Sequence, residues 1–281
     1  EIVVCCSGEL HAEVTLNDLY NEYTNNIEII RSNPIVNYKE TITEKSEKIC
    51  LAKSTNKLNR IWIQAEPLAE ELVTDLEEGV FKFSKDINVV AKQLHEKYNW
   101  EINEAKKVWM FGPEECPNNV LVDKTTAVQY LLEAKDSIVS SFYNSTTEGV
   151  LAKESVRGCR YNIVDVNLHS DKVHRSTVQI FSASRRAHLG SQYVSKPRFL
   201  EPVFLAEIQV PQNSIGGVYT CLSKRRGIVF SEEAVDNTDL LILQAYLPVS
   251  ESFGFTASLR NSTSGQAFPQ CTFSHWSVIE S

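Results

Sequence analysis

The carboxy-terminal stretch of this chain shows an order of secondary-structure signals that few folds can satisfy. After Pro197 the pattern predicts strand, helix, strand, strand, helix and strand, over 203–210, 213–225, 227–230, 240–248, 251–262 and 267–276. This β-α-β-β-α-β order is that of the ferredoxin-like fold. We therefore expect residues 201–281 to form a small α+β domain of that type.

The remaining residues predict two more units, because 281 residues are too many for one ordinary domain. Residues 1–31 predict a strand over 2–6, a helix over 9–23 and a strand over 27–30, which is half of a second ferredoxin-like unit. The chain opens in the middle of that predicted strand, so we expect it to be part of a longer protein. The sequence Ser32-Asn33-Pro34 marks the boundary to the next unit.

Residues 32–200 predict a mixed α+β domain. Strands are expected over 36–43, 48–52, 60–66 and 159–168, and helices over 68–76, 85–98, 125–147 and 180–194. The strand over 159–168 is apolar on both faces, which predicts a central position in a sheet.

Two polar loops in this domain are the candidate functional residues. The loop 53–60 contains Ser54, Asn56, Lys57, Asn59 and Arg60, and the loop 169–175 contains His169, Asp171, Lys172, His174 and Arg175. At one end of a rigid sheet, such amides, imidazoles and cations could form a tip that contacts RNA. From the pattern alone, an ordinary polar turn with two exposed histidines is the alternative interpretation.

Catalysis by this chain is not expected. The sequence contains no GxxxxGK(S/T), GxSxG or HExxH motif, so it predicts neither a bound triphosphate, nor a catalytic residue, nor a metal site. We expect no cofactor in the chain.

The charge and the cysteines restrict partners and compartment. A net charge of −8 argues against nucleic-acid binding over the whole surface, so any RNA contact must be local. The seven cysteines are scattered and odd in number, which suits buried thiols in a reducing cytoplasm. No run of about 20 apolar residues predicts a membrane span.

Several long motifs follow one another in the order found in one protein family. They are GELH (8–11), KSTNKLNR (53–60), WMFGPE (109–114), NLHSDKVHRSTVQ (167–179), EPVFLAEIQVP (201–211), YLPVSESFGFTASLR (246–260) and GQAFPQCTFSHW (265–276). On these motifs the chain resembles the carboxy-terminal half of elongation factor 2 of eukaryotes and archaea. The resemblance covers essentially its whole length.

The resemblance implies three domains and a role in translocation. Residues 1–31 would be the end of domain III, 32–200 domain IV with a ribosomal-protein-S5-like fold, and 201–281 domain V. Domain IV of this family enters the ribosomal A site and maintains the reading frame while tRNA and mRNA move, its tip formed by the loops 53–60 and 169–175. The implied partners of this monomer are the decoding region of the small subunit, the factor-binding region of the large subunit and the tRNA–mRNA complex. GTP and magnesium would bind in an amino-terminal half that this chain lacks, and the parent would be a ribosome-stimulated GTPase.

The resemblance also implies that His174 is the residue converted to diphthamide. The family has three glycines where this chain has Ser176, Thr177 and Val178, and a histidine where it has Leu58. Either the loop conformation has changed or it does not need glycine. Two paralogues stay open as alternatives, a structural GTPase of the spliceosome and a GTPase of ribosome maturation.

Overall fold

The computed structural model describes residues 2–6, 8–24, 27, 29–80, 86–113, 116–236 and 238–279. Contacts divide the chain into two units, which are described separately. One comprises Tyr38–Leu200 with Val278–Ser281, and the other comprises Glu1–Asn37 with Glu201–Ser277. No helix in the described residues is long and apolar enough to cross a membrane.

A five-stranded sheet forms the centre of the unit around Tyr38–Leu200. Its order is β2-β3-β6-β5-β4, with bounds β2 (Cys50–Lys53), β3 (Arg60–Pro67), β6 (Cys159–Asn167), β5 (Asn119–Asp123) and β4 (Val108–Gly112). The central position predicted for the strand over 159–168 is confirmed. Strands β5 and β6 are parallel, and α5 (Leu131–Thr147) connects them; the other neighbours are antiparallel.

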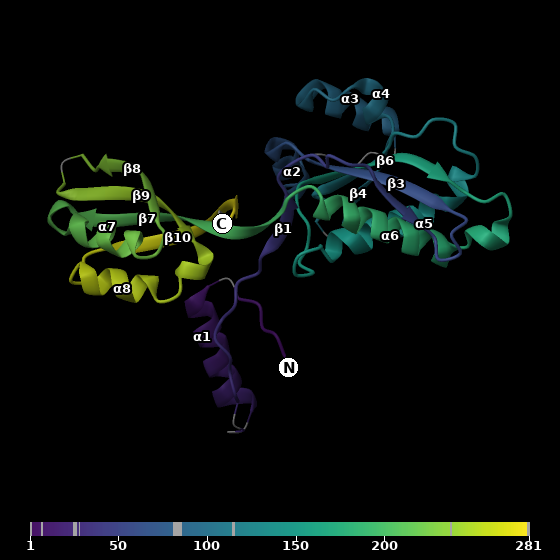
Figure 1. The fold of residues 1–281 in the computed structure, drawn as a ribbon. Helices are drawn as coiled ribbons and strands as arrows, with labels where there is room; N and C mark the ends of the chain where they lie inside the picture. Colours follow the sequence, from purple (N-terminus) through teal and green to yellow (C-terminus); the bar gives the residue numbers. More distant parts are fainter. Residues whose placement is uncertain are drawn as a thin grey trace. The chain divides into compact units, whose positions relative to one another are not determined.

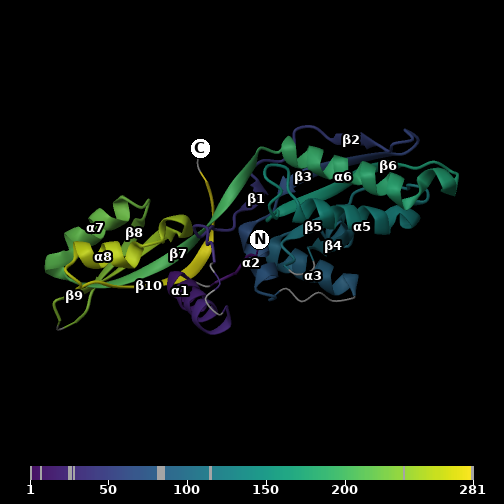
Figure 2. The same ribbon diagram turned by 90° about the horizontal axis from the view of Figure 1, so that it is seen from below.

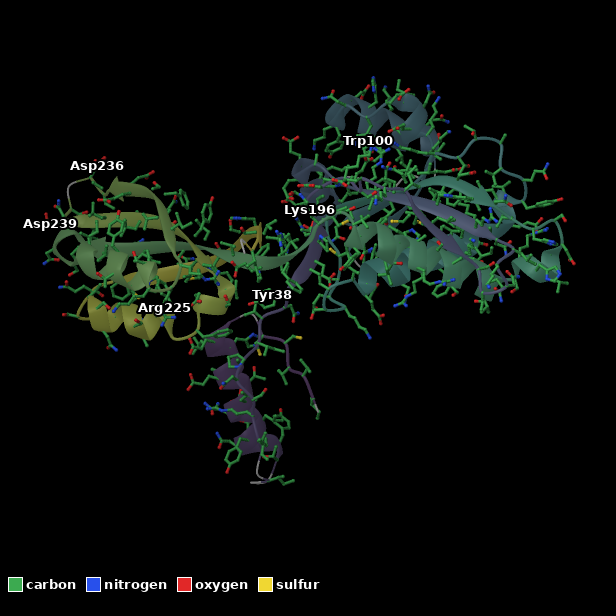
Figure 3. The ribbon with its side chains drawn as sticks, viewed as in Figure 1. Tyr38, Trp100, Lys196, Arg225, Asp236 and Asp239 are labelled. Atoms are coloured by element: carbon green, nitrogen blue, oxygen red, sulfur yellow. The ribbon has the colours of Figure 1, made fainter. Side chains whose placement is uncertain are left out.

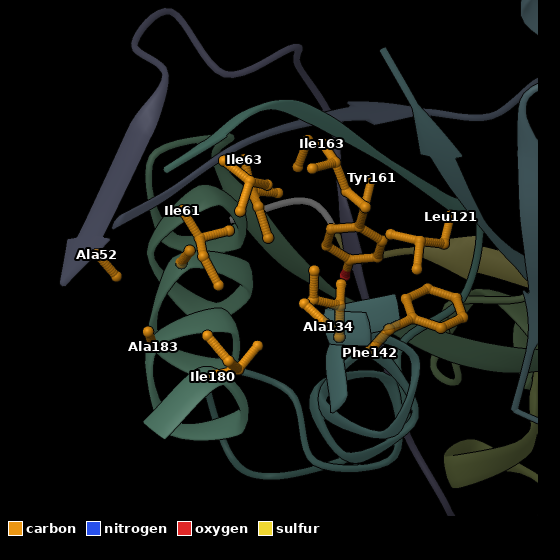
Figure 4. Close-up of a cluster of buried hydrophobic side chains, with 14 of the residues drawn as sticks. Ala52, Ile61, Ile63, Leu121, Ala134, Phe142, Tyr161, Ile163, Ile180 and Ala183 are labelled. Atoms are coloured by element: carbon orange, nitrogen blue, oxygen red, sulfur yellow. The ribbon is translucent and has the colours of Figure 1, made fainter. Parts of the chain in front are cut away.

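Helices cover both faces of this sheet (Figures 1 and 2). Helices α5 and α6 (Thr177–Tyr193) pack on one face, where Ile61, Ile63, Tyr161 and Phe142 are buried (Figure 4). Helices α2 (Glu70–Glu77), α3 (Ile87–Tyr98) and α4 (Ile102–Ala105) share a second buried cluster with β4 and β5. One face of β6 is apolar, whereas the other carries Arg160 and Asn162, which are buried and hydrogen-bonded to each other at 2.9 Å.

The second unit has the predicted ferredoxin-like order. Its strands are β7 (Pro197–Pro211), β8 (Ile228–Ala234), β9 (Leu240–Pro248) and β10 (Phe268–Val278), arranged β10-β7-β9-β8. Helices α7 (Ile215–Ser223) and α8 (Phe255–Ser262) contribute Val218, Leu222 and Leu259 to the apolar cluster on one face of this sheet. Short 3₁₀ turns at Gln212–Ser214 and Val249–Glu251 precede α7 and α8. Residues 197–200 of β7 belong to the first unit, where they pair with strand β1 (Lys39–Ile42).

The predictions for residues 1–31 were only partly correct. The expected helix is present as α1 (Glu9–Asp18), followed by a π-helical turn at Leu19–Tyr23. The strand expected over 2–6 is wrong: these residues are not in a strand, and Ile2 is 91% exposed. The same holds for Ile27, Ile29 and Ile30, while Glu28 and the expected loop residues Asn25 and Asn26 lie outside the described residues. A strand needs a hydrogen-bonded neighbour, and the described residues offer none here.

Other differences have local causes. Helix α5 begins at Leu131 rather than at 125, because Ala127 and Tyr130 take positive φ angles of 53° and 62°, which a helix does not allow. Helix α6 begins at Thr177, three residues before the predicted start at Ile180. Strands β4 and β5 were not predicted, because a short apolar run does not distinguish a strand from a buried helical turn.

Candidate functional site

Two loops that are far apart in the sequence meet at one end of the five-stranded sheet. The first tip loop, residues 53–60, connects β2 to β3, and the second tip loop, residues 169–175, follows β6. Arg60 pairs with Lys53 on one side and with Asn167 on the other, so both loops leave the sheet at the same end. The second tip loop contains a 3₁₀ turn at Lys172–Arg175, and Asp171 caps it by accepting from the backbone N–H of Val173 at 3.1 Å.

Asn59 and Ser54 are buried between the loops. The side-chain Nδ2 of Asn59 donates to the carbonyl of His174 at 2.8 Å, and its Oδ1 accepts from the N–H of His169 at 3.0 Å. The hydroxyl of Ser54 accepts from the N–H of Asn59 at 3.0 Å, which closes the first tip loop on itself. Their exposures of 0% and 2% exclude direct contact with a partner in this conformation. We therefore revise the predicted role of both residues from contact to positioning.

Asn56 provides a second link between the loops. Its Nδ2 also donates to the carbonyl of His174, at 2.7 Å, and its backbone N–H donates to Oε1 of Gln179 at 3.1 Å. Its Oδ1 accepts from the N–H of Leu58 at 3.1 Å. The polar groups of Asn56 are therefore used within the site.

Arg175 also holds the loop rather than presenting its charge. Its guanidinium donates to the carbonyl of His169 at 2.9 Å and to the carboxylate of Glu133 at 2.9 Å, and it lies 4.1 Å from the ring centroid of Tyr130. Only 7% of the Arg175 side chain is exposed. The contact role predicted for Arg175 is revised in the same way.

The two histidines lie against each other. The ring centroids of His169 and His174 are 4.9 Å apart with the planes at 89°, and Nδ1 of His169 accepts from the N–H of Asp171 at 3.1 Å. The Asp171 carboxylate lies 3.8 Å from Nε2 of His174. These side chains remain accessible, since 46% of His174 and 54% of Asp171 are exposed. In the described residues, no group of three or more His, Cys, Asp or Glu side chains is placed to hold a metal ion.

The residues after the second tip loop do not need to be glycine in this structure. Ser176 caps α6 with φ −60° and ψ 156°, and Thr177 and Val178 form the first helical turn. None of the three has a positive φ, so a β-branched valine is accommodated without strain. The side chain of Val178 is 74% exposed, as is 41% of Leu58 in the first tip loop.

Two family models match the chain. The model of elongation factor G, domain IV, matches residues 80–193, and the model of the elongation factor G C-terminus matches residues 198–281. The chain belongs to the elongation factor G family. It is a carboxy-terminal region of such an elongation factor, and the second tip loop lies inside the domain IV match. The first tip loop precedes the match, and the pairing of β3 with β6 places it in the same sheet.

In this elongation factor region, cations without carboxylate partners gather at the tip. In the part of the chain that the structure describes, Lys57, Arg60 and Lys172 are exposed and form no ion pair. Many cations elsewhere in the unit are paired, for example Arg157 with Glu70 and Glu77. Exposed cations without a carboxylate partner on two adjoining loops are an arrangement suited to an anionic ligand.

The predicted site omitted two residues that belong to this group. Lys53 lies directly opposite Arg60 across the β2–β3 pair, and Arg186 of α6 donates to the backbone carbonyl of Lys53. Both are exposed and form no ion pair in the described residues. The strand register could have identified Lys53, whereas nothing in the local sequence around Arg186 points to the first tip loop.

Proposed function

We propose that this region is the carboxy-terminal arm of a eukaryotic-type elongation factor 2, and that its tip contacts RNA in the ribosomal A site during GTP-dependent translocation. The observation that supports the proposal most is the group of unpaired cations on the two tip loops. The tip cations would attract RNA phosphates only locally, because the chain as a whole carries a net charge of −8 and repels them elsewhere. The arm would hold the tRNA–mRNA complex in frame as it moves through the decoding region of the small subunit.

The geometry suits an arm that acts mechanically. Asn56, Asn59 and Arg175 fix the loops to each other through hydrogen bonds to backbone groups, so the exposed residues are presented in one arrangement. Pre-organisation lowers the entropic cost of binding and lets force pass from the sheet to the bound RNA. The contacting residues in this proposal are Lys57, Arg60, Asp171, Lys172, His169 and His174.

The chemistry would be located elsewhere in a full-length factor. The chain has no phosphate-binding loop motif, so we propose that GTP and magnesium bind in another region and that this arm is not itself catalytic. We further propose a monomer that acts in the cytoplasm and also contacts the factor-binding region of the large subunit. Calorimetry of this chain with GTP should then show no binding at micromolar concentrations.

The modification of His174 separates a diphthamide-bearing translocase from a variant without it. The side chain of His174 is 46% exposed, so an enzyme could reach it. Mass spectrometry of its peptide, from protein isolated from its native cells, would show a diphthamide mass or an unmodified histidine. The diphthamide mass would support the translocase. An unmodified residue would favour a diphthamide-free translocase or one of the two paralogues, which a translocation assay separates.

Cross-linking tests the position of the tip. A photoreactive residue replaces Lys172 in the full-length factor, which is bound to ribosomes before translocation with labelled tRNA and mRNA. We expect RNA cross-links from position 172 and none from position 106, where Lys106 is also exposed but follows α4, outside both tip loops. Equal cross-linking from both positions, or none from 172, would contradict the proposed contact.

A further inference from the structure

Next to the tip, the sheet face opposite α5 and α6 carries a group of exposed or half-buried side chains on β2, β3 and β6. In β3, Ile61 and Ile63 are fully buried in the cluster with α5 and α6. Because side chains alternate along a strand, Arg60 and Trp62 lie on the opposite face. In β2, Ala52 belongs to the same buried cluster, so Leu51 and Lys53 lie on the same face as Trp62.

The register aligns these side chains in two adjacent rows. Leu51, Trp62 and Asp165 form one row across β2, β3 and β6, and Lys53, Arg60 and Asn167 form the next. Trp62 is half-buried, and the five residues around it are exposed. We call these six residues the Trp62 face. It is continuous with both tip loops, since Lys53, Arg60 and Asn167 lie at or beside the residues where the loops begin or end.

Trp62 differs from the other tryptophans of this unit. Trp100, beside α3 (Figure 3), packs against a buried cluster and has the guanidinium of Arg160 4.1 Å from its ring centroid. Trp109 packs against the other cluster and has Nζ of Lys135 at 5.4 Å. In the described residues, Trp62 belongs to neither cluster and has no such cation. Trp62 is half-buried, so part of its side chain remains open to solvent.

Lys53 and Arg60 make the face cationic. Like charges directly opposite each other on neighbouring strands destabilise a sheet, and neither side chain has a carboxylate partner in the described residues. The carboxylate in the arrangement, Asp165, lies opposite Trp62, and its Oδ1 accepts from the N–H of Val166 at 2.8 Å. An anion placed between Lys53 and Arg60 would relieve their repulsion. A ring beside two unpaired cations suits a ligand that alternates flat bases with phosphates.

We infer that the Trp62 face binds single-stranded RNA, with one base stacked on the indole and the adjoining phosphates at Lys53 and Arg60. Stacking on an aromatic ring accepts any base, and the cations follow the backbone. Asp165 and Asn167 provide an acceptor and an amide for the edge of the stacked base. The inference rests on the proposed function, because it extends the RNA contact from the tip loops onto the sheet.

The test measures binding of a fluorescent hexauridylate to the 281-residue chain at low salt, by anisotropy. We expect Trp62→Leu to weaken binding about tenfold and Trp62→Phe to weaken it much less, because the second variant keeps a ring. Lys53→Ala and Arg60→Ala should each weaken binding and reduce its salt dependence by about one ion. Phe230→Leu is the matched control, an aromatic residue 48% exposed in the other unit, and should bind as the unchanged protein does.

Several outcomes would overturn the inference. They are no binding by the unchanged chain, equal binding of an RNA duplex, and equal affinity of Trp62→Leu and the unchanged chain. Equal losses in Trp62→Leu and Trp62→Phe would also overturn it, because the ring would then have no stacking role. Lys57→Ala distinguishes this inference from the proposed function. If Lys57→Ala binds the RNA more weakly while Trp62→Leu binds it as the unchanged chain does, RNA contact is restricted to the tip loops. If Trp62→Leu fails to fold, Lys53→Ala and Arg60→Ala still test the inference, because each should weaken RNA binding.

Discussion

The side-chain amide of Asn59 donates to the backbone carbonyl of His174, with 2.8 Å between Nδ2 and the oxygen. The same side chain accepts from the N–H of His169 at 3.0 Å and is fully buried. One residue of the first tip loop thus satisfies two backbone groups of the second. The two loops therefore behave as a single structural element.

Replacing Asn59 with alanine should separate the loops. The change leaves the half-buried N–H of His169 without an acceptor, so we expect a loss of about 1–3 kcal/mol in the free energy of unfolding. Urea unfolding, followed by tryptophan fluorescence, measures the loss, and hydrogen exchange should become faster at the amide of His169. The control is Asn261→Ala, because Asn261 is exposed and its side chain makes no hydrogen bond in the described residues. Equal stability of the two variants would contradict the link between the loops.

The buried carboxylate of Glu40 should make Gly149 irreplaceable. Glu40 accepts from the N–H groups of Leu151 and Ala152, both at 2.8 Å. A Cβ on residue 149 would lie 2.3 Å from Oε2 of Glu40 and 2.9 Å from the carbonyl of Glu154. Gly149→Ala must displace the carboxylate from these donors, and we expect a loss of about 2 kcal/mol or more in the free energy of unfolding.

The matched control for that prediction is Gly216→Ala. A Cβ at residue 216 meets no atom within 4 Å, and the residue lies in α7. Because alanine favours a helix over glycine, this variant should be as stable as the unchanged chain or more stable, by up to about 1 kcal/mol. Thermal unfolding compares the two variants. A Gly149→Ala variant that unfolds at the same temperature as Gly216→Ala would refute the proposed clash.

Burial of His188 should make the first unit acid-sensitive. Burial lowers the pKa of His188 to about 4 from its ordinary value of 6.5, since the ring is fully buried. Because the pKa is lowered, the neutral ring contributes its full share to the free energy of unfolding above pH 6.5. This contribution is lost as the pH falls toward 4. The loss amounts to about 3 kcal/mol. Tyr161, which lies beside it, does not interfere, because burial raises the pKa of Tyr161 well above its ordinary value.

The test compares urea unfolding at pH 7.5 and 4.5 for the unchanged chain and for His188→Gln. Carboxylates titrate in both proteins, so the difference between their pH dependences isolates the histidine. We expect the variant to lose less stability on acidification than the unchanged chain does. His275→Gln, at an exposed position in the other unit, is measured in parallel as the control for replacement of a histidine. Identical pH dependences for His188→Gln and the unchanged chain would show that His188 does not control it.

The sequence predicted the parts of the fold that depend on local pattern. The alternation of Ile61 and Ile63 correctly indicated a strand. The strand predicted over 159–168 is central in the sheet, although one of its faces is polar rather than apolar. The element order after Pro197 correctly predicted the ferredoxin-like sheet. What failed depends on neighbours: an apolar segment such as 2–6 becomes a strand only when another strand pairs with it.

The candidate site shows the same limit. The residue types of the two tip loops correctly indicated that the loops meet. They did not indicate which residues hold the loops together and which are exposed for contact. Ser54, Asn59 and Arg175 have the hydrogen-bonding groups expected of RNA-contacting residues, and the structure uses these groups inside the site. Lys53 begins the predicted tip loop 53–60, and its pairing with Arg60 adds it to the contact candidates. Burial and register are tertiary properties, so sequence composition does not distinguish a positioning arginine from a contacting one.

We propose that the exposed cations of the tip drive the movement of RNA and not the hydrolysis of GTP. The most direct measurement is the rate of single-round translocation by the full-length factor carrying Lys57→Ala and Lys172→Ala, with GTP hydrolysis followed in the same reactions. We expect translocation to slow roughly tenfold, for two contacts worth about 0.7 kcal/mol each, with GTP hydrolysis still stimulated by ribosomes. The control, Lys92→Ala with Lys106→Ala, removes the same charge from exposed positions on or near α3 and α4 and should translocate normally. Normal translocation by the tip variant, or equal slowing in the control, would contradict the account.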